Sequence, residues 1–119
     1  MRKVLIADDE PMIRDGLAEM LTGFESGLSI VGKAKNGVEA LNMAEIFRPD
    51  IILADICMPK LSGLDFVRQL HETEKSKSDI IIISGYHEFE YARQAISLGV
   101  KEYLLKPIKE EELKSILER

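Results

Sequence analysis

Polar and charged residues follow four of the short apolar runs in this sequence. Asp8 and Asp9 come directly after the first run, and Asp55 comes after the third. Ser84 follows the fourth run, and Lys106 follows the fifth. Three carboxylates in one cleft repel one another, and a hard divalent cation such as Mg²⁺, which prefers oxygen ligands, removes that conflict. These residue types therefore predict a magnesium site beside a hydroxyl group and an ammonium group.

The same residue types suit phosphoryl transfer. The transferred group carries charge on its outer oxygens, so its transfer depends mainly on positioning and charge neutralisation. A carboxylate can serve as the nucleophile and become an aspartyl phosphate. Lys106 would then pair with a phosphoryl oxygen, Ser84 would donate a hydrogen bond, and Gly85 would leave the approach open.

Each of these residues also has a purely structural explanation. The run Asp8-Asp9-Glu10-Pro11 suits a helix start, with an acid as the cap and proline in the first turn. A lone aspartate, serine or lysine after a strand is often a turn or capping residue. A functional site is favoured because the groups follow different apolar runs, and the carboxyl ends of parallel strands meet at one edge of a sheet.

Hydrophobic periodicity indicates the elements that would position these residues. Five apolar runs predict strands at Val4–Ala7, Leu28–Val31, Ile51–Ala54, Ile80–Ile83 and Tyr103–Leu105. Between the runs, apolar residues recur at helical spacing. These stripes are Ile13, Leu17, Met20, Leu21 and Phe24; Val38, Leu41 and Ala44; Leu64, Val67 and Leu70; Phe89, Ala92, Ala95 and Ile96; and Leu113, Ile116 and Leu117.

Residues at the ends of these elements add detail. Pro11 should begin the first helix, and Gly99 should end the fourth. Lys33 and Lys35, at the end of the second apolar run, are typical of an edge strand.

Five strands alternating with five helices predict an α/β fold, a five-stranded parallel sheet with helices on both faces. Right-handed crossovers carry each helix over the sheet. In the doubly wound, flavodoxin-like order 2-1-3-4-5, the first and third strands are neighbours. Asp8, Asp9 and Asp55 would then converge at one edge of the sheet.

Size and composition limit the other choices. A chain of 119 residues with 45% hydrophobic residues suits one domain with its own core. A single cysteine and the lack of an apolar stretch of about 20 residues predict a cytoplasmic protein without a membrane span. A net charge of −5 argues against direct nucleic-acid binding by this domain.

Over its whole length, the sequence resembles the receiver domain of two-component response regulators. The resemblance is carried by Leu5–Pro11, Asp55–Pro59, Ser62-Gly63, Ile83–Gly85 and Lys106-Pro107. It implies a signalling switch that catalyses only its own phosphotransfer and dephosphorylation and is otherwise no enzyme. A sensor histidine kinase would donate the phosphoryl group from a phosphohistidine.

The resemblance also implies a role for each site residue. Asp55 would be the phosphoacceptor, and Asp9 and Asp55 would bind Mg²⁺ directly. The backbone carbonyl of Cys57 would be a third ligand, and Asp8 would act through a bound water. A cis peptide bond is expected between Lys106 and Pro107.

A switch and a partner surface are further implications of the resemblance. On phosphorylation, Ser84 would turn toward the phosphoryl group and the ring of Tyr103 would move inward. The surface of the fourth helix, fifth strand and fifth helix would then recruit a partner, often a second copy. The stretches 84–92 and 103–108 look like receivers attached to AraC-type helix-turn-helix domains. We therefore expect residues 1–119 to be the receiver, without its DNA-binding output domain.

Two positions depart from the common pattern of this family. Cys57 stands where many members carry asparagine or another polar residue, and Tyr86 is a bulky neighbour of Ser84. The resemblance implies that both positions tune hydrolysis of the acyl phosphate by admitting or excluding water. We interpret the Cys57 thiol as a small apolar filler rather than a redox sensor.

Three alternative functions can be weighed on the same residues. A haloacid dehalogenase-type phosphatase needs a second aspartate where Cys57 stands. In a flavodoxin-type electron carrier, the acids after the first strand would repel the flavin phosphate. A receiver fold that acts through protein contacts without phosphate is the remaining alternative, although the full set of site residues argues against it.

Overall fold

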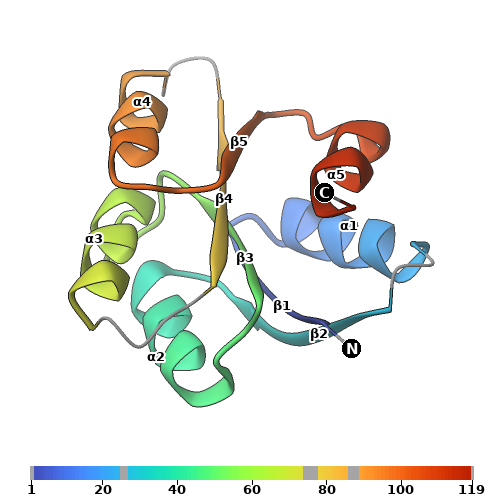
Figure 1. The fold of residues 1–119 in the computed structure, drawn as a ribbon, viewed down its shortest axis with the longest axis horizontal. Helices are drawn as coiled ribbons and strands as arrows, with labels where there is room; N and C mark the ends of the chain where they lie inside the picture. Colours follow the sequence, from blue (N-terminus) through green and yellow to red (C-terminus); the bar gives the residue numbers. More distant parts are fainter. Residues whose placement is uncertain (1, 25–26, 74–77, 86–88, 119) are drawn as a thin grey trace.

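The computed structural model describes residues 2–24, 27–73, 78–85 and 89–118. Strands and helices alternate along these residues (Figure 1). The strands are β1 (Arg2–Ala7), β2 (Leu28–Ala34), β3 (Ile51–Asp55), β4 (Asp79–Ser84) and β5 (Glu102–Leu105). The helices are α1 (Pro11–Thr22), α2 (Gly37–Phe47), α3 (Gly63–Thr73), α4 (Phe89–Ser97) and α5 (Glu110–Leu117).

The five strands form one parallel sheet in the order β2-β1-β3-β4-β5. Helices α2, α3 and α4 cover one face, and α1 and α5 cover the other (Figure 1). The predicted fold class and strand order are confirmed, as is the edge position of β2. None of the helices in the described part of the chain has the length and apolar character to cross a membrane.

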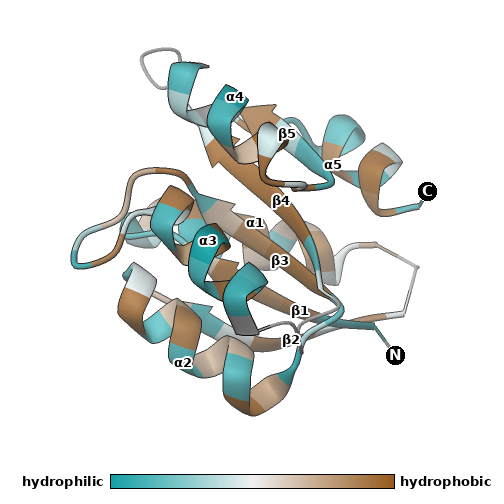
Figure 2. Cartoon of the chain, turned by 60° about the vertical axis from the view of Figure 1, so that its left-hand side comes forward, coloured by the Kyte–Doolittle hydropathy of each residue, from teal (hydrophilic) through white to brown (hydrophobic). Residues whose placement is uncertain are grey.

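Each face of the sheet carries its own hydrophobic core, because parallel strands bury both sides. β3 is buried along its whole length, and β4 is buried from Ile80 onward. Figure 2 shows the apolar strands between the helices; α3 and α4 are largely hydrophilic on the outside, whereas α2 exposes Val38, Ile46 and Phe47. The predicted stripes of α3 and α5 are buried, as expected: Leu64, Val67, Leu70, Leu113, Ile116 and Leu117.

Among the stripe residues whose side chains the structure describes, two are exposed. Val38 is 43% exposed, because α2 turns Ala40 and Ala44 toward the sheet instead. Ile96 is 44% exposed, whereas its neighbour Ala95 is fully buried. In both helices alanine occupies the inner face, since a small side chain allows close approach to the strands.

Two glycines hold the loop that follows Asp55. A Cβ atom on Gly37 would lie 1.8 Å from the carbonyl oxygen of Leu61, and one on Gly63 would lie 2.2 Å from that of Asp55. The amide of Gly63 also donates a 2.8 Å hydrogen bond to the carbonyl of Ile56. The starts of α2 and α3 therefore press directly on residues 56–62 and fix the backbone beside the site.

We expect Gly37→Ala to lower the free energy of unfolding by about 2 kcal/mol, because the new methyl group overlaps a backbone carbonyl. Gly16→Ala is the matched control, since a Cβ there meets nothing within 4 Å in the middle of α1. It should raise stability by about 0.5 kcal/mol through helix propensity. Urea denaturation of both variants checks this, and equal effects would contradict the proposed contact.

Candidate functional site

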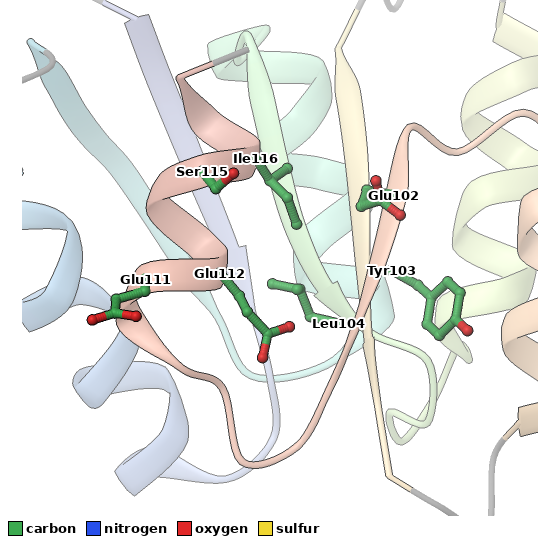
Figure 3. Close-up of a pocket in the computed structure, with 7 residues that line it drawn as sticks. All are labelled: Glu102, Tyr103, Leu104, Glu111, Glu112, Ser115 and Ile116. Carbon is green, nitrogen blue, oxygen red and sulfur yellow. The ribbon is translucent and has the colours of Figure 1, made fainter.

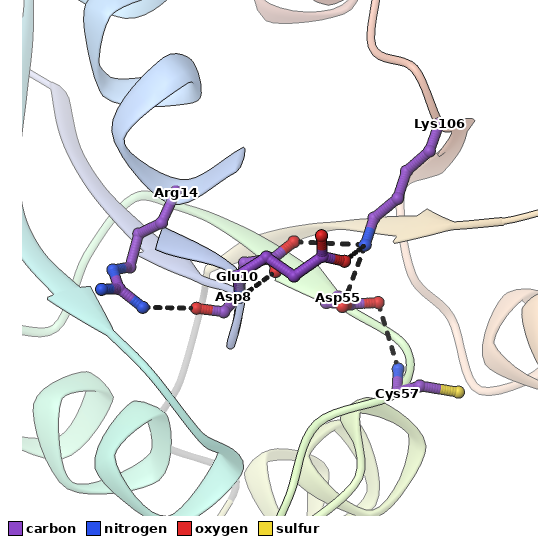
Figure 4. A network of polar contacts seen from close by, with 6 residues as sticks. All are labelled: Asp8, Glu10, Arg14, Asp55, Cys57 and Lys106. Carbon is purple, nitrogen blue, oxygen red and sulfur yellow. Dashed lines mark hydrogen bonds and ion pairs between the residues drawn. The ribbon is translucent and has the colours of Figure 1, made fainter. Parts of the chain in front are cut away.

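Polar residues lie at the carboxyl ends of four strands of the sheet, and Figure 4 shows three of them, Asp8, Asp55 and Lys106. Asp8 follows β1, and Asp55 ends β3 beside it, because Ala7 pairs with Ala54 in the parallel register. Ser84 ends β4, and its carbonyl accepts a 2.8 Å hydrogen bond from the amide of Lys106. The pairing of the strands thus brings Asp8 and Asp55 together at this edge, as the strand order predicts.

The ammonium group of Lys106 lies among three carboxylates (Figure 4). Its Nζ atom is 3.1 Å from Oδ2 of Asp55 and 3.5 Å from Oδ2 of Asp8, and both of these side chains are almost fully buried. It is also 3.4 Å from Oε1 of Glu10, whose side chain is 59% exposed. Lys106 therefore joins the buried acids to an acid at the rim.

Burial dominates the electrostatics of the two buried acids. Burial, with the charge of Asp8, raises the pKa of Asp55 to about 6, and the hydrogen bond from the Cys57 amide and the charge of Lys106 offset only part of this increase. Burial likewise raises the pKa of Asp8. Burial alone would lower the pKa of Lys106, but the charges of Asp55 and Asp8 outweigh it and raise that pKa. The site has more negative charge than its one ammonium group neutralises.

Two buried polar atoms lack a hydrogen-bond partner among the residues that the structure describes. They are Oδ2 of Asp8, which has only the ion pair with Lys106, and Oγ of Ser84. Buried polar atoms normally have partners, and leaving one without a partner costs about 1–3 kcal/mol. An acceptor and a hydroxyl without hydrogen bonds thus lie at the ends of β1 and β4, where an ion and an oxyanion could use them.

A group of acids could hold a metal ion at this edge of the sheet. Oxygen atoms of Asp8, Asp9 and Glu10 lie within 4.8 Å of one another. Asp9 is exposed, whereas Asp8 is fully buried. Asp55 is outside this group, although it shares Lys106 with Asp8. Carboxylate oxygens are the donors that Mg²⁺ prefers, so the donor set fits this ion.

Glu10 and Arg14 have contacts at the site that the sequence analysis did not predict. Glu10 is the N-cap residue of α1, but its side chain makes no capping hydrogen bond within the described residues. Its amide donates a 2.9 Å bond to Oδ1 of Asp8. Arg14 donates from Nη1 to the backbone carbonyl of Asp8 at 2.9 Å. The acidic run was the available signal for Glu10, but a run of acids does not reveal where each side chain points.

Cys57 lies beside the candidate phosphoacceptor, and its amide donates a 3.2 Å bond to Oδ1 of Asp55. Its thiol is exposed and points away from Asp55 (Figure 4), so the interpretation of the thiol as a small apolar filler is wrong. The backbone amide of Cys57 therefore faces the site, whereas its side chain is exposed. With Asp9, Cys57 lines a groove of about 730 Å³ next to α3 and α4.

The remaining predicted residues lie farther from this network. Tyr103 is half-buried against the core on the α2–α3–α4 face. Tyr86 falls outside the described residues, so its expected effect on hydrolysis stays a prediction. The cis peptide bond between Lys106 and Pro107 is confirmed.

A groove between β5 and α5 lies on the surface expected to form a homodimer (Figure 3). Three glutamates, Glu102, Glu111 and Glu112, line the groove. Leu104 and Ile116 also line it. Like charges facing one another oppose self-association. The expected homodimer therefore has no support from this surface.

The fold and this acidic edge of the sheet define a class of protein, and comparison with known proteins identifies it. The model of the response regulator receiver domain matches residues 4–118. The chain belongs to this family, the receiver domains of two-component response regulators.

Named relatives agree with this family. The chain is 42% identical to the transcriptional regulatory protein YesN of Bacillus subtilis over 99% of its own length and 32% of that protein. It is 36% identical to the transcriptional regulatory protein HptR of Staphylococcus aureus, of which it covers 46%. The chain thus spans a third to a half of the length of these relatives.

A solved structure supports the same assignment. The receiver domain of AraT, a response regulator from Geobacillus stearothermophilus, is 40% identical with a TM-score of 0.88. The alignment covers 98% of this chain and 90% of that one. The architecture of this chain is therefore that of an experimentally determined receiver domain.

Proposed function

We propose that this domain is a magnesium-dependent phosphorylation switch and that Asp55 accepts the phosphoryl group from a sensor histidine kinase. The observation that carries the proposal is the environment of Asp55. Its buried carboxylate is 3.1 Å from the ammonium of Lys106 and shares that ammonium with Asp8. A phosphoryl group on Asp55 would find the hydroxyl of Ser84 at the end of the neighbouring strand β4, and the ammonium group of Lys106 just after β5.

The chain's own residues have distinct parts in this reaction. Asp55 supplies the attacking carboxylate oxygen, and its bond to the Cys57 amide orients the carboxylate. Lys106 pairs with an oxygen of the transferred group, because charge neutralisation is the main requirement of phosphoryl transfer. Ser84, whose Oγ has no hydrogen bond within the described chain, donates to another oxygen.

The acids at the end of β1 fit a magnesium ion. Asp8 has a buried oxygen without a hydrogen-bond partner among the described residues, and Asp9 is exposed beside it. We assign Asp9, Asp55 and the backbone carbonyl of Cys57 as direct ligands, with Asp8 acting through water. Bound there, Mg²⁺ would neutralise charge on the phosphoryl oxygens.

Regulation would follow from the same geometry. We propose that Ser84 turns toward the phosphoryl group and that Tyr103, now half-buried, moves inward. The domain would catalyse only its own phosphotransfer and dephosphorylation, in the cytoplasm. Relatives two to three times longer are named transcriptional regulatory proteins, which supports an output domain that regulates transcription. We propose that this output domain is a DNA-binding domain of the AraC type.

Intact-protein mass spectrometry after incubation with acetyl phosphate tests the proposal. We expect a single phosphoryl adduct that requires Mg²⁺ and is lost in Asp55→Asn, because asparagine has no nucleophilic carboxylate. Asp15→Asn is the matched control, since Asp15 is an exposed aspartate on α1. Its adduct should equal that of the unsubstituted chain.

Two results would contradict the proposal. An adduct that survives in Asp55→Asn would place phosphorylation on another residue. Beryllofluoride with Mg²⁺ mimics the phosphoryl group. If the domain binds no beryllofluoride and also forms no adduct, the result would favour the phosphate-independent protein-interaction module.

A further inference from the structure

Lys106 and a divalent cation would compete for the same negative charge. Nζ of Lys106 lies 3.1 Å from Asp55 and 3.5 Å from Asp8, the two buried acids of the site. A divalent cation bound by these carboxylates repels the ammonium group of Lys106 and neutralises the negative charge with which that group is paired. Lys106 must therefore find another partner if it is to stay near Asp55 when the ion binds.

Glu10 is placed to be that partner. Its Oε1 lies 3.4 Å from Nζ of Lys106 (Figure 4), and its side chain is 59% exposed. Its backbone is fixed, because its amide donates to Asp8 and Arg14 holds the Asp8 carbonyl. Among the described acids in contact with Lys106, Glu10 is the only exposed one, so it loses the least hydration in pairing.

We propose that Glu10 is a positioning residue for Lys106. When a divalent cation takes the charge of Asp8 and Asp55, Glu10 retains the ammonium group at the rim of the site, within reach of a phosphoryl group on Asp55. This lowers the cost of displacing Lys106 and so strengthens binding of the ion. The inference rests on the proposed function, which assigns the ion and the phosphoryl group to this site.

A different role for Glu10 has to be separated from this one. Its carboxylate lies within 4.8 Å of oxygens of Asp8 and Asp9, so it could act on the ion directly, as a ligand or a nearby charge. A direct effect does not need Lys106, whereas a positioning effect disappears with it. A double-mutant cycle separates the two.

The experiment is a titration with MgCl₂ at constant ionic strength, followed by nuclear magnetic resonance of backbone amides without a phosphodonor. Glu10→Gln should weaken Mg²⁺ binding about threefold, the size expected for an ion pair open to solvent. In a Lys106→Met background, the same substitution should change affinity by less than about 1.5-fold. Lys106→Met alone should bind Mg²⁺ more tightly, because a competing cation is gone.

Two further variants sharpen the comparison. Glu10→Asp keeps the negative charge but shortens the side chain by one methylene group, so the carboxylate can no longer pair with Lys106. If pairing with Lys106 is what strengthens Mg²⁺ binding, this variant should lose as much affinity as Glu10→Gln. Glu72→Gln removes an exposed charge near the far end of α3 and should leave affinity unchanged. Urea denaturation of each variant confirms that the fold is intact.

Two outcomes would overturn the positioning role of Glu10. One is an equal loss of Mg²⁺ affinity from Glu10→Gln with and without Lys106, which would show a direct effect on the ion. The other is a normal affinity in Glu10→Asp. An unsubstituted chain that fails to bind Mg²⁺ would overturn the proposed function, and this inference with it.

Discussion

Asp55→Asn is expected to stabilise the metal-free domain at pH 7.5 by about 2 kcal/mol. The cause is the environment of Asp55, which is 2% exposed and has its pKa raised from 3.8 to about 6 by burial and by the charge of Asp8. A tenfold difference in proton affinity between the folded and unfolded states corresponds to about 1.4 kcal/mol. Ionised Asp55 therefore opposes folding, and a neutral side chain of the same shape relieves this.

The effect should depend on pH in a definite direction. The folded state holds the Asp55 proton more tightly than the unfolded state, so this group's stabilising contribution is complete below pH 3.8 and is lost as the pH rises through about 6. The advantage of Asp55→Asn should therefore be largest above pH 7, and it should shrink toward pH 4.5.

Urea denaturation at pH 7.5 and pH 4.5, with a chelator present, measures both parts of this prediction. Addition of Mg²⁺ at pH 7.5 should stabilise the unsubstituted chain more than the variant, because the ion needs the Asp55 charge. A variant that is less stable than the unsubstituted chain at pH 7.5 without metal would mean that the ion pair with Lys106 outweighs the burial of Asp55.

Lys106→Met should have the opposite effect on the metal-free domain, a loss of about 3 kcal/mol at pH 7.5. Methionine fills a similar volume, but it leaves Asp8 and Asp55 buried together without the cation that lies within 3.5 Å of both. Removing one partner of a buried ion pair is costly, because the remaining charges lose their compensation. Mg²⁺ should restore much of the loss, since it can supply the missing positive charge.

Lys101→Met is the matched control for this substitution. Lys101 pairs with Asp79 at 3.4 Å, and both side chains are open to solvent, so its loss should cost less than about 1 kcal/mol and should not respond to Mg²⁺. Urea denaturation of the two variants with and without MgCl₂ gives the comparison. If Mg²⁺ leaves the Lys106 variant unchanged, the ammonium group and the ion do not share these acids.

The sequence was sufficient to predict the order of the elements and the edge of the sheet where the site lies. Ile51–Ala54 and Ile80–Ile83 are apolar throughout, which is typical of strands covered on both faces, and the helical segments between the strands require parallel pairing. Because parallel strands end at a common edge, residues as distant in sequence as Asp8 and Lys106 were predicted to meet.

Side-chain direction, in contrast, was decided by the tertiary structure. Val38 faces outward because Ala40 and Ala44 occupy the inner positions of α2, and Cys57 is exposed although its chain neighbours Ile56 and Met58 are buried. The pairing of Glu10 with Lys106 depends on where α1 begins relative to β5. Periodicity records how often an apolar residue recurs, but the rotation of a helix and the path of a loop depend on packing against distant segments. For that reason the sequence predicted which residues gather at the site, and only the fold determined the contacts among them.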